Sequence, residues 1–245
     1  SEEVLEGIRD VIADNPAWGV RKVWATLRRQ KGLKVSRRRV HALMREHDLV
    51  LRRDREPGEV TRGHVSVPEP NRRLATDLTR VWTRIDGWVP VTLAIDCGCR
   101  SVLSLDVCDD ETSPSVLACV REALAYAFGS PESVPEGMEL RSDHGPQYTG
   151  VDCQDLATEW NIDHTFAPVG RPTGNAVVER VIRTMKEEVV WLRDWDSAEE
   201  LRVALEAWRH KYNTERPHMA LGYLTPQEYR DAKLDVEPSE LSAAA

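Results

Sequence analysis

The spacing of apolar residues divides the chain into two differently organised parts. In the first 50 residues, apolar side chains recur every three or four positions in three short segments, 3–14, 20–30 and one that follows Ser36. Asn15-Pro16 ends the first segment, and Ser36 is suited to cap the N-terminus of the third. Three short helices joined by tight turns predict a helix-turn-helix module.

After Leu74 the pattern changes to short apolar runs that alternate with longer helical segments. Three strands with short connections come first, and strands then alternate with helices, which predicts an α/β unit whose mixed sheet has helices on its faces. A final helix is predicted over 197–212. The predicted strands are 74–79, 88–96, 100–107, 138–142 and 163–167, and the helices between and after them are 113–128, 151–160 and 175–193.

The net charge of −8 argues superficially against a nucleic-acid partner, but its distribution is uneven. Residues 1–66 contain 15 basic and 10 acidic residues and so carry +5, which leaves −13 for the remainder. Residues 21–55 alone contain 13 basic residues against three acids. Because DNA responds to the local field, a basic N-terminal part is compatible with DNA binding.

A membrane location and a disulfide framework are not expected. No stretch of about 18 uncharged apolar residues exists, and the acidic, mixed N-terminus does not resemble a secretory signal. The five cysteines are scattered and odd in number, which is typical of reduced thiols in a cytoplasmic protein. Cys97 and Cys99 are interpreted as strand residues rather than zinc ligands.

Arg37, Arg38 and Arg39 begin the third predicted helix. Cations in a first turn oppose the helix macrodipole, and this arrangement makes sense if an anion approaches the site. The first turn of a recognition helix is also where DNA contacts are made. On this segment alone, a solvated basic face is an equally good interpretation.

Three acids stand out by their positions. Asp77 lies within the first strand, Asp143 ends the fourth strand in S-D-H-G-P-Q-Y-T, and Glu179 lies in the first turns of the long helix. A loop rich in turn residues, 170–174, precedes that helix. Magnesium is a hard cation that takes oxygen ligands, and two such ions can activate and stabilise oxygens at phosphorus. Other acids, such as Asp96, are read as solvated surface groups.

Helix geometry supports the selection of Glu179. At about 100° per residue, Asn175, Glu179, Arg183 and Lys186 fall within about 80° of one another. We expect Asn175, Arg183 and Lys186 to contact DNA beside the acids, because they share this face. An apolar stripe, about 120° away, is expected to pack on the sheet. The stripe consists of Val178, Val181, Met185, Val189 and Leu192.

Together these motifs resemble the DDE signature of retroviral integrases and related transposases. Asp77, Asp143 and Glu179 match the three acids, with 35 residues between the last two, and Lys186 matches the basic residue seven positions later. The likeness is closest to the second-frame product of the IS-three family of bacterial insertion sequences. It rests on S-D-H-G-P-Q-Y-T, on N-A-V-V-E-R with K-E-E, and on Y-N-T-E-R-P-H-M-A-L-G-Y-L-T-P.

The resemblance covers about residues 15–230 and implies an RNase H-like catalytic fold. It also implies 3′-end cleavage and strand transfer with two Mg²⁺ ions, or Mn²⁺ as a substitute, held by the three acids. The expected partners are the double-stranded DNA of element ends and target, further copies of the chain in a synaptic complex, and an upstream-frame partner or fusion. The expected location is cytoplasmic, at the nucleoid.

Together with the pattern of predicted elements, the resemblance predicts how the chain is divided into domains. The predicted domains are a helix-turn-helix-like DNA-binding domain (1–50), a basic, proline-containing linker (51–72), an integrase catalytic core (73–194), a C-terminal helical extension (195–230) and a disordered tail (231–245).

Two alternatives to an active transposase remain open at this point. One keeps the fold but performs only metal-dependent nuclease cleavage, without strand transfer. The other is a catalytically idle, transposase-derived subunit that binds DNA, although the intact acids speak against it. Two positions depart from the family pattern: Arg141 replaces a usual His, and Asn175 directly follows Gly174 where Asp-Asn is common.

Overall fold

A computed structural model describes residues 2–51, 67, 69–167 and 175–234. The chain divides into two compact units. The first comprises Ser1–Val60 with Arg216–Thr225, and the second comprises Thr61–Glu215 with Pro226–Ala245. Most of the predicted linker, the loop 170–174 and the end of the predicted tail lie outside the described residues.

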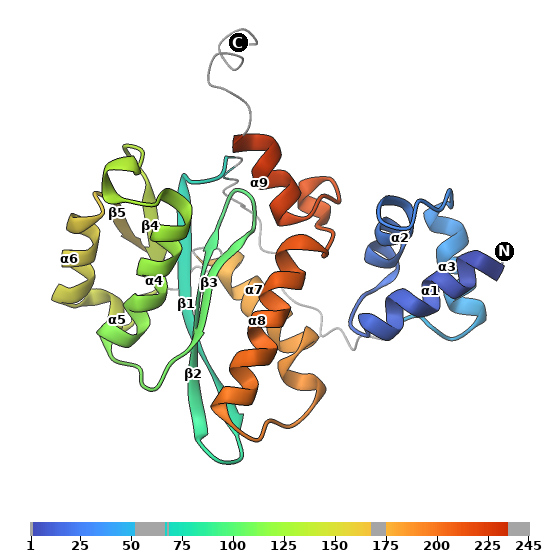
Figure 1. Cartoon of the computed structure of the whole chain (residues 1–245), viewed down its shortest axis with the longest axis horizontal. Helices are drawn as coiled ribbons and strands as arrows, with labels where there is room; N and C mark the ends of the chain where they lie inside the picture. Colours follow the sequence, from blue (N-terminus) through green and yellow to red (C-terminus); the bar gives the residue numbers. More distant parts are fainter. Residues whose placement is uncertain (1, 52–66, 68, 168–174, 235–245) are drawn as a thin grey trace, which may run out of the picture. The chain divides into compact units, whose positions relative to one another are not determined.

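The first unit contains the three predicted helices, α1 (Glu2–Asp14), α2 (Val20–Arg29) and α3 (Arg37–Glu46) (Figure 1). The Ser36 hydroxyl accepts a hydrogen bond from the backbone N–H of Arg39 at 3.2 Å, which confirms the predicted cap. The apolar faces of the three helices meet in a small core. Its fully buried members are Ile8, Val23, Leu27, Val40 and Met44.

A C-terminal segment belongs to this first unit as well, which the sequence did not predict. It includes a short 3-10 helix, η3 (Met219–Leu221). The Tyr223 ring packs edge-on against Trp24 of α2, with ring centroids 5.3 Å apart. The second part of the Y-N-x-x-R-P-H-x-x-L-G-Y motif, residues 216–223, therefore belongs to the helical unit.

The second unit contains a mixed sheet in the order β3-β2-β1-β4-β5. Adjacent strands β1, β2 and β3 are antiparallel, whereas β4 is parallel to β1 and β5 is parallel to β4. The first three strands are joined by tight turns, and each of the last two follows a helical connection. The strands are β1 (Arg73–Thr83), β2 (Gly87–Asp96), β3 (Val102–Val107), β4 (Glu139–Ser142) and β5 (Asp163–Phe166).

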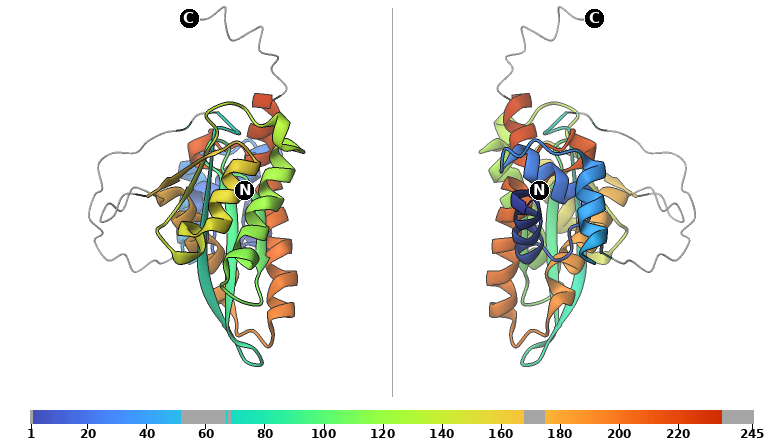
Figure 2. Two further views of the ribbon diagram at one scale, coloured as in Figure 1. Left: turned by 90° about the vertical axis from the view of Figure 1, so that its left-hand side faces the viewer. Right: turned by 90° about the vertical axis from the view of Figure 1, so that its right-hand side faces the viewer.

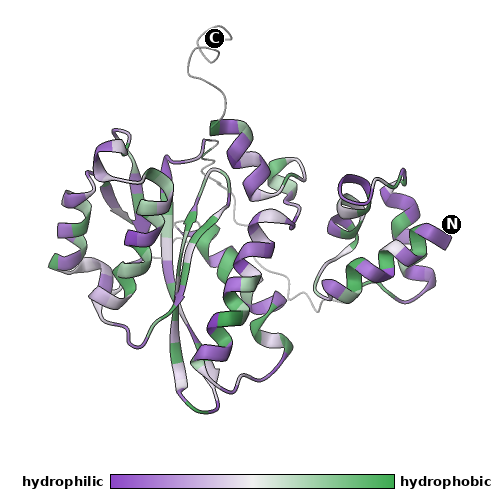
Figure 3. Cartoon of the chain, in the orientation of Figure 1, coloured by the Kyte–Doolittle hydropathy of each residue, from purple (hydrophilic) through white to green (hydrophobic). Residues whose placement is uncertain are grey.

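Helices cover both faces of this sheet (Figures 1 and 2). One core forms between the sheet and α4 and α6, and the other forms between the sheet and α7 and α8. Helix α9 packs against α8. Figure 3 shows hydrophobic and hydrophilic residues alternating along the helices that cover the sheet. The helices are α4 (Ser113–Phe128), α5 (Pro146–Thr149), α6 (Val151–Glu159), α7 (Ala176–Glu188), α8 (Ala198–Thr214) and α9 (Pro226–Leu234), with 3-10 turns η1 (Pro131–Ser133) and η2 (Val190–Leu192).

Several boundaries differ from the prediction. Helix α7 ends at Glu188 instead of 193, because the chain tightens into the 3-10 turn η2, and Leu192 is 53% exposed rather than on the apolar stripe. Helix α9 continues to Leu234, so residues 231–234 are helical rather than part of the tail.

The structure also corrects the interpretation of Cys97, Cys99 and Asp96. Cys97 and Cys99 lie in a turn after β2, not in a strand, and all five cysteines are buried free thiols. Asp96 is completely buried instead of solvated. Its carboxylate accepts hydrogen bonds from the backbone N–H groups of Asn71 and Gly98.

Within the described residues, no helix is long and apolar enough to cross a membrane.

Candidate active site

The pairing of β1 with β4 brings the two aspartates to neighbouring positions. Their parallel register places Leu74 beside Leu140 and Ala75 beside Arg141. Continued for two residues, the same register places Asp77 beside Asp143. Asp143 directly follows the end of β4, so its carboxylate extends beyond the paired strand.

Strand alternation decides which face of the sheet Asp77 occupies. Successive side chains point to opposite faces, so Asp77 shares a face with Ala75 and Val81. Those two residues belong to the core that includes Val178 and Met185 of α7. Asp77 therefore points to the face that α7 covers, and Glu179 lies in the first turn of that helix.

The pKa of Asp77 depends on its burial and on the charges of the other two acids. Burial raises the pKa of Asp77 from its ordinary value of 3.8 to about 6, and the hydrogen bond from the Leu78 N–H, 2.8 Å long, opposes this rise. The negative charges of Asp143 and Glu179 raise the pKa further, whereas the positive charge of Lys186 lowers it. One strand, one strand end and one helix thus contribute to a single cluster of charges.

A tight turn holds the Asp143 carboxylate. Its Oδ1 accepts a hydrogen bond from the backbone N–H of Gly145 at 2.9 Å. A Cβ atom on Gly145 would lie 2.4 Å from Nε2 of Gln147 and 2.9 Å from Oδ1 of Asp143, so a side chain there would displace both groups. Behind the turn, the hydroxyl of Ser142 lies 2.9 Å from Nε2 of His164 on β5.

Asn175 connects the start of α7 to the strand that carries Asp77. Its side chain is only 5% exposed, and its Nδ2 donates a hydrogen bond to the main-chain oxygen of Thr76 at 3.2 Å. The Thr76 hydroxyl in turn lies 3.2 Å from the hydroxyl of the buried Tyr148. Thr76 and Tyr148 were not selected from the sequence, although Tyr148 belongs to the S-D-H-G-P-Q-Y-T motif that marked Asp143.

The remaining candidates lie on accessible surfaces. Lys186 is half-buried in the last turn of α7, near enough to affect Asp77. Arg183 is exposed and pairs with Glu187 one turn later at 2.9 Å. Arg37, Arg38 and Arg39 are exposed on the first turn of α3, in the other unit.

Among the residues that the structure describes, no three His, Cys, Asp or Glu side chains already form a metal-binding cage. The acids are therefore neighbours that influence one another, but they are not drawn together as the ligands of one ion.

Family comparisons agree with the two-unit organisation. Residues 67–172 match one integrase core domain family, residues 161–226 match a second, and residues 1–57 match a family of HTH-like domains. The first two matches span the sheet, α7 and α8, and the third contains α1, α2 and α3.

Curated relatives are transposases of insertion elements. Transposase InsD for insertion element IS2A/D/F/H/I/K of Escherichia coli is 30% identical over 237 residues, which cover 93% of this chain and 78% of the relative. Transposase InsD for insertion element IS2-9, from a strain of the same species, is also 30% identical over 237 residues and is covered to 76% of its length.

Solved structures show the same fold at low identity. The catalytic core domain of HTLV-2 integrase in complex with magnesium (trimeric form) has a TM-score of 0.50 and 16% identity, over 66% of this chain and 97% of that one. A chain of a simian T-cell lymphotropic virus intasome has a TM-score of 0.55 and 20% identity, over 84% and 73%. The predicted RNase H-like α/β sheet with a preceding all-α unit is confirmed. The chain belongs to the family of insertion-element transposases with an integrase core domain, and it is a protein of DNA transposition.

Proposed function

We propose that this transposase cleaves the 3′ ends of its insertion element and transfers them to target DNA, with Asp77, Asp143 and Glu179 as the acids that hold two Mg²⁺ ions. The observation that carries the proposal is the register of β1 with β4, which brings Asp77 beside Asp143 on the sheet that α7, the helix of Glu179, covers. The raised pKa of Asp77, due mainly to burial and in part to the charges of Asp143 and Glu179, agrees with this arrangement. Like-charged groups in one partly buried cluster are unfavourable unless a cation compensates them.

The chemistry of the donors fits magnesium or manganese. Carboxylate oxygens are the ligands that these hard cations prefer, and three acids from separate elements can approach two ions from different sides. When bound, such a pair of ions activates the attacking oxygen and stabilises the leaving oxygen of a phosphodiester. Since the acids do not form a closed cage, ion binding is expected to draw their carboxylates together.

The neighbouring residues of the chain have supporting roles in this proposal. Asn175 positions the first turn of α7, and thereby Glu179, against the strand of Asp77. Gly145 fixes one oxygen of Asp143 through its N–H. The charge of Lys186 acts on Asp77, and its flexible stem suits it to bind a phosphate of the DNA end as a point charge.

The burial of Asn175 changes the role expected for it. Its amide nitrogen is bound to Thr76, and only 5% of the residue is accessible, so a positioning role is better supported than the DNA contact expected from the helix face. Arg183 and Lys186 remain proposed DNA contacts.

Double-stranded DNA is the proposed partner of both units. In the first unit, the exposed Arg37, Arg38 and Arg39 are proposed to contact phosphates at the first turn of the recognition helix α3. Joining two element ends to one target requires two active sites, so we propose that copies of this chain assemble in a synaptic complex. An upstream-frame partner or fusion remains a proposal that follows from the second-frame resemblance.

A joining assay tests the proposal. Pre-cut element ends and a target duplex are incubated with the protein and Mg²⁺ or Mn²⁺, and joined and nicked products are separated. Asp77→Asn, Asp143→Asn and Glu179→Gln should each abolish both products, because each change removes a charged ligand and little volume. Asp152→Asn is a matched control, since Asp152 is an exposed acid on α6 outside the cluster.

The outcomes discriminate between the alternatives. Nicked products without joined products would identify a nuclease without strand transfer, and duplex binding without either product would identify an idle DNA-binding subunit. Full joining by any one of the three acid variants would remove that residue from the site.

A further inference from the structure

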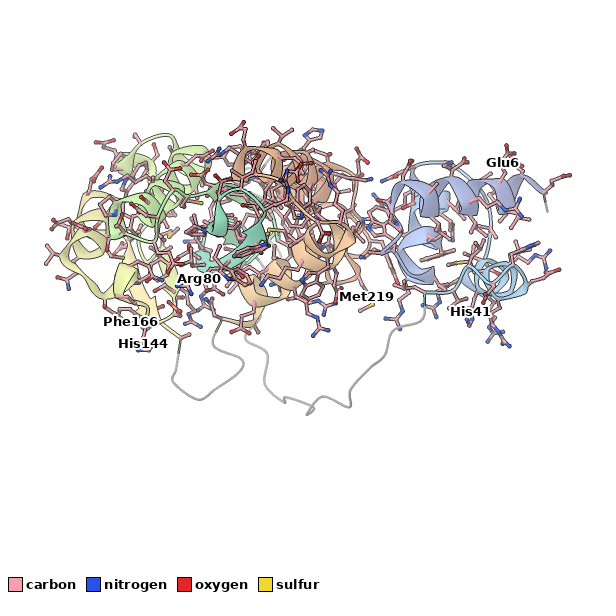
Figure 4. All side chains as sticks on the ribbon, turned by 90° about the horizontal axis from the view of Figure 1, so that it is seen from below. Glu6, His41, Arg80, His144, Phe166 and Met219 are labelled. Carbon is pink, nitrogen blue, oxygen red and sulfur yellow. The ribbon has the colours of Figure 1, made fainter. Side chains whose placement is uncertain are left out.

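Two aromatic rings lie at the surface directly beside Asp143. The imidazole of His144, the next residue, stacks on the phenyl ring of Phe166 at the end of β5, with ring centroids 4.7 Å apart and planes inclined by 23°. His144 is exposed, and Phe166 is 37% exposed. Figure 4 shows the two side chains next to each other at one edge of the unit.

The pair is supported from within the fold. His164, two residues before Phe166, packs against the same phenyl ring with centroids 4.6 Å apart. The His164 ring is fixed in turn, because its Nε2 lies 2.9 Å from the Ser142 hydroxyl and its Nδ1 lies 3.6 Å from the thiol of Cys153. The backbone N–H of Ala167 also bonds to the oxygen of Ser142 at 2.8 Å. The strand end that carries Phe166 is therefore tied to the turn that carries Asp143.

This arrangement is not explained by packing. An accessible phenyl ring stacked on an accessible imidazole leaves π surface in water that neither hydrophobic core uses. A nucleobase has two π faces, and base stacking on aromatic side chains is a general mode of binding unpaired nucleotides.

We propose that His144 and Phe166 form a stacking platform for one unpaired nucleobase next to the phosphodiester that Asp143 acts upon. The inference rests on the proposed function, because that function brings a DNA strand to Asp143. A base displaced from a duplex loses a few kcal/mol of stacking and pairing, and an aromatic platform returns part of this energy. The base comes either from the element end or from the target strand.

Binding to DNA with and without the base tests the proposal. Fluorescently labelled element ends with a short single-stranded extension are compared with the same DNA carrying one abasic position, and the abasic position is moved along the extension. A second set places the abasic position in the target duplex. Anisotropy is measured in EDTA, so that cleavage does not contribute.

The wild-type protein should bind one position about tenfold more tightly with the base than without it, which corresponds to about 1.4 kcal/mol. His144→Ala with Phe166→Leu should abolish this preference while the affinity for abasic DNA stays the same. Phe166→Trp should retain the preference, because it keeps an aromatic face. Tyr126→Leu is the control, since Tyr126 is an exposed aromatic residue of α4 outside the platform.

The set of DNA in which the preference occurs identifies the source of the base. If the double variant prefers DNA with the base as strongly as the wild type does, the platform is overturned and the proposed function is unaffected. Failure of the wild-type protein to bind any of these DNAs would contradict the proposed function itself.

Discussion

The Nδ2 of Asn175 donates a hydrogen bond of 3.2 Å to the main-chain oxygen of Thr76, the residue before Asp77. This contact joins two segments that are far apart in the sequence, the first strand and the helix that carries Glu179. It therefore sets the relative position of two of the three proposed metal ligands, although Asn175 itself has no charge.

Asn175→Ala should weaken the binding of Mn²⁺ about tenfold, because a poorly fixed Glu179 approaches the ions less often. Asn175→Asp also loses the donor to the Thr76 oxygen, but its carboxylate adds attraction for the cation, so Mn²⁺ affinity should fall less than in Asn175→Ala. Titration calorimetry with Mn²⁺ measures both, and joining by Asn175→Ala should recover at higher Mn²⁺ concentration.

Asn213 offers a matched control for this prediction. Its side chain also links a helix to the main chain of a strand. Its Nδ2 donates a hydrogen bond to the main-chain oxygen of Val102, and its Oδ1 accepts one from the N–H of Val102, both at 2.9 Å. Asn213→Ala should cost about 1 to 2 kcal/mol of stability and leave Mn²⁺ affinity unchanged. An equal loss of Mn²⁺ affinity in both variants would mean that Asn175 acts only through general stability.

Asp77→Asn should stabilise the protein in the absence of divalent cations. Each pKa unit corresponds to about 1.4 kcal/mol. Removal of this charge should therefore raise the free energy of unfolding at pH 7 by at most about 3 kcal/mol. Because the pKa of Asp77 is about 6 in the folded protein and 3.8 ordinarily, the folded state retains its proton between these values. The corresponding stability is present below pH 3.8 and is lost as the pH rises to about 6.

Urea unfolding from pH 4 to pH 8, in EDTA, measures this effect. The difference between Asp77→Asn and the wild type should be small near pH 4 and should reach its full size above pH 6. Mg²⁺ should then stabilise the wild type and not the variant. If the variant is less stable than the wild type at pH 8 in EDTA, burial and the neighbouring charges do not disfavour the ionised carboxylate of Asp77.

The sequence predicted the order of strands and helices along the chain well, and it failed where the burial of a residue depends on contacts between distant segments. Alternation and helical spacing are local, so they placed Asp77 in a strand and Glu179 on a helix. The burial of Asp96 and Asn175 could not be read locally, because each is buried by partners more than 20 positions away, among them Arg230 and Thr76.

Removal of one partner of the buried pair between Asp96 and Arg230 should strongly destabilise the second unit. The two side chains are 0% and 6% exposed, and Nη1 of Arg230 lies 3.2 Å from Oδ2 of Asp96. Asp96→Ala leaves a buried guanidinium without its partner and should cost about 3 to 5 kcal/mol in a denaturant titration.

Asp106 provides the exposed comparison, because its carboxylate is 42% exposed and lies 3.6 Å from Arg202. Asp106→Ala should cost at most about 1 kcal/mol. The interpretation of Asp96 is wrong if the two substitutions have the same cost.

The arginines that begin α3 should determine how DNA binding by the chain depends on salt. Each of Arg37→Ala, Arg38→Ala and Arg39→Ala should reduce the slope of log affinity against log salt by about 0.9, if the residue contacts one phosphate. Arg9→Ala is the control, because Arg9 is exposed on α1 of the same unit. Slopes for the three variants that match the Arg9→Ala slope would assign these arginines to a solvated face.

Lys186 is expected to have two separable effects, one on the DNA end and one on Asp77. It lies seven residues after Glu179, about 10 Å further along the helix axis, and its charge lowers the pKa of Asp77. Lys186→Ala should therefore weaken binding of the DNA end, since a phosphate contact is lost. It should also strengthen Mn²⁺ binding, most clearly at pH 8, because a positive charge that repels the metal is removed; near pH 6 the accompanying rise in the pKa of Asp77 offsets part of this gain.

The Arg substitution separates charge from the identity of the side chain. Lys186→Arg keeps a positive charge of similar reach, so it should retain both DNA-end binding and the pH dependence of Mn²⁺ binding. Lys233→Ala, at an exposed lysine of α9, should behave as the wild type. DNA-end affinity and Mn²⁺ affinity at the two pH values are measured for all three variants. If Lys186→Ala is indistinguishable from Lys233→Ala in both, Lys186 belongs to the ordinary helix surface, because a lysine beside a DNA phosphate and beside Asp77 must alter at least one of them.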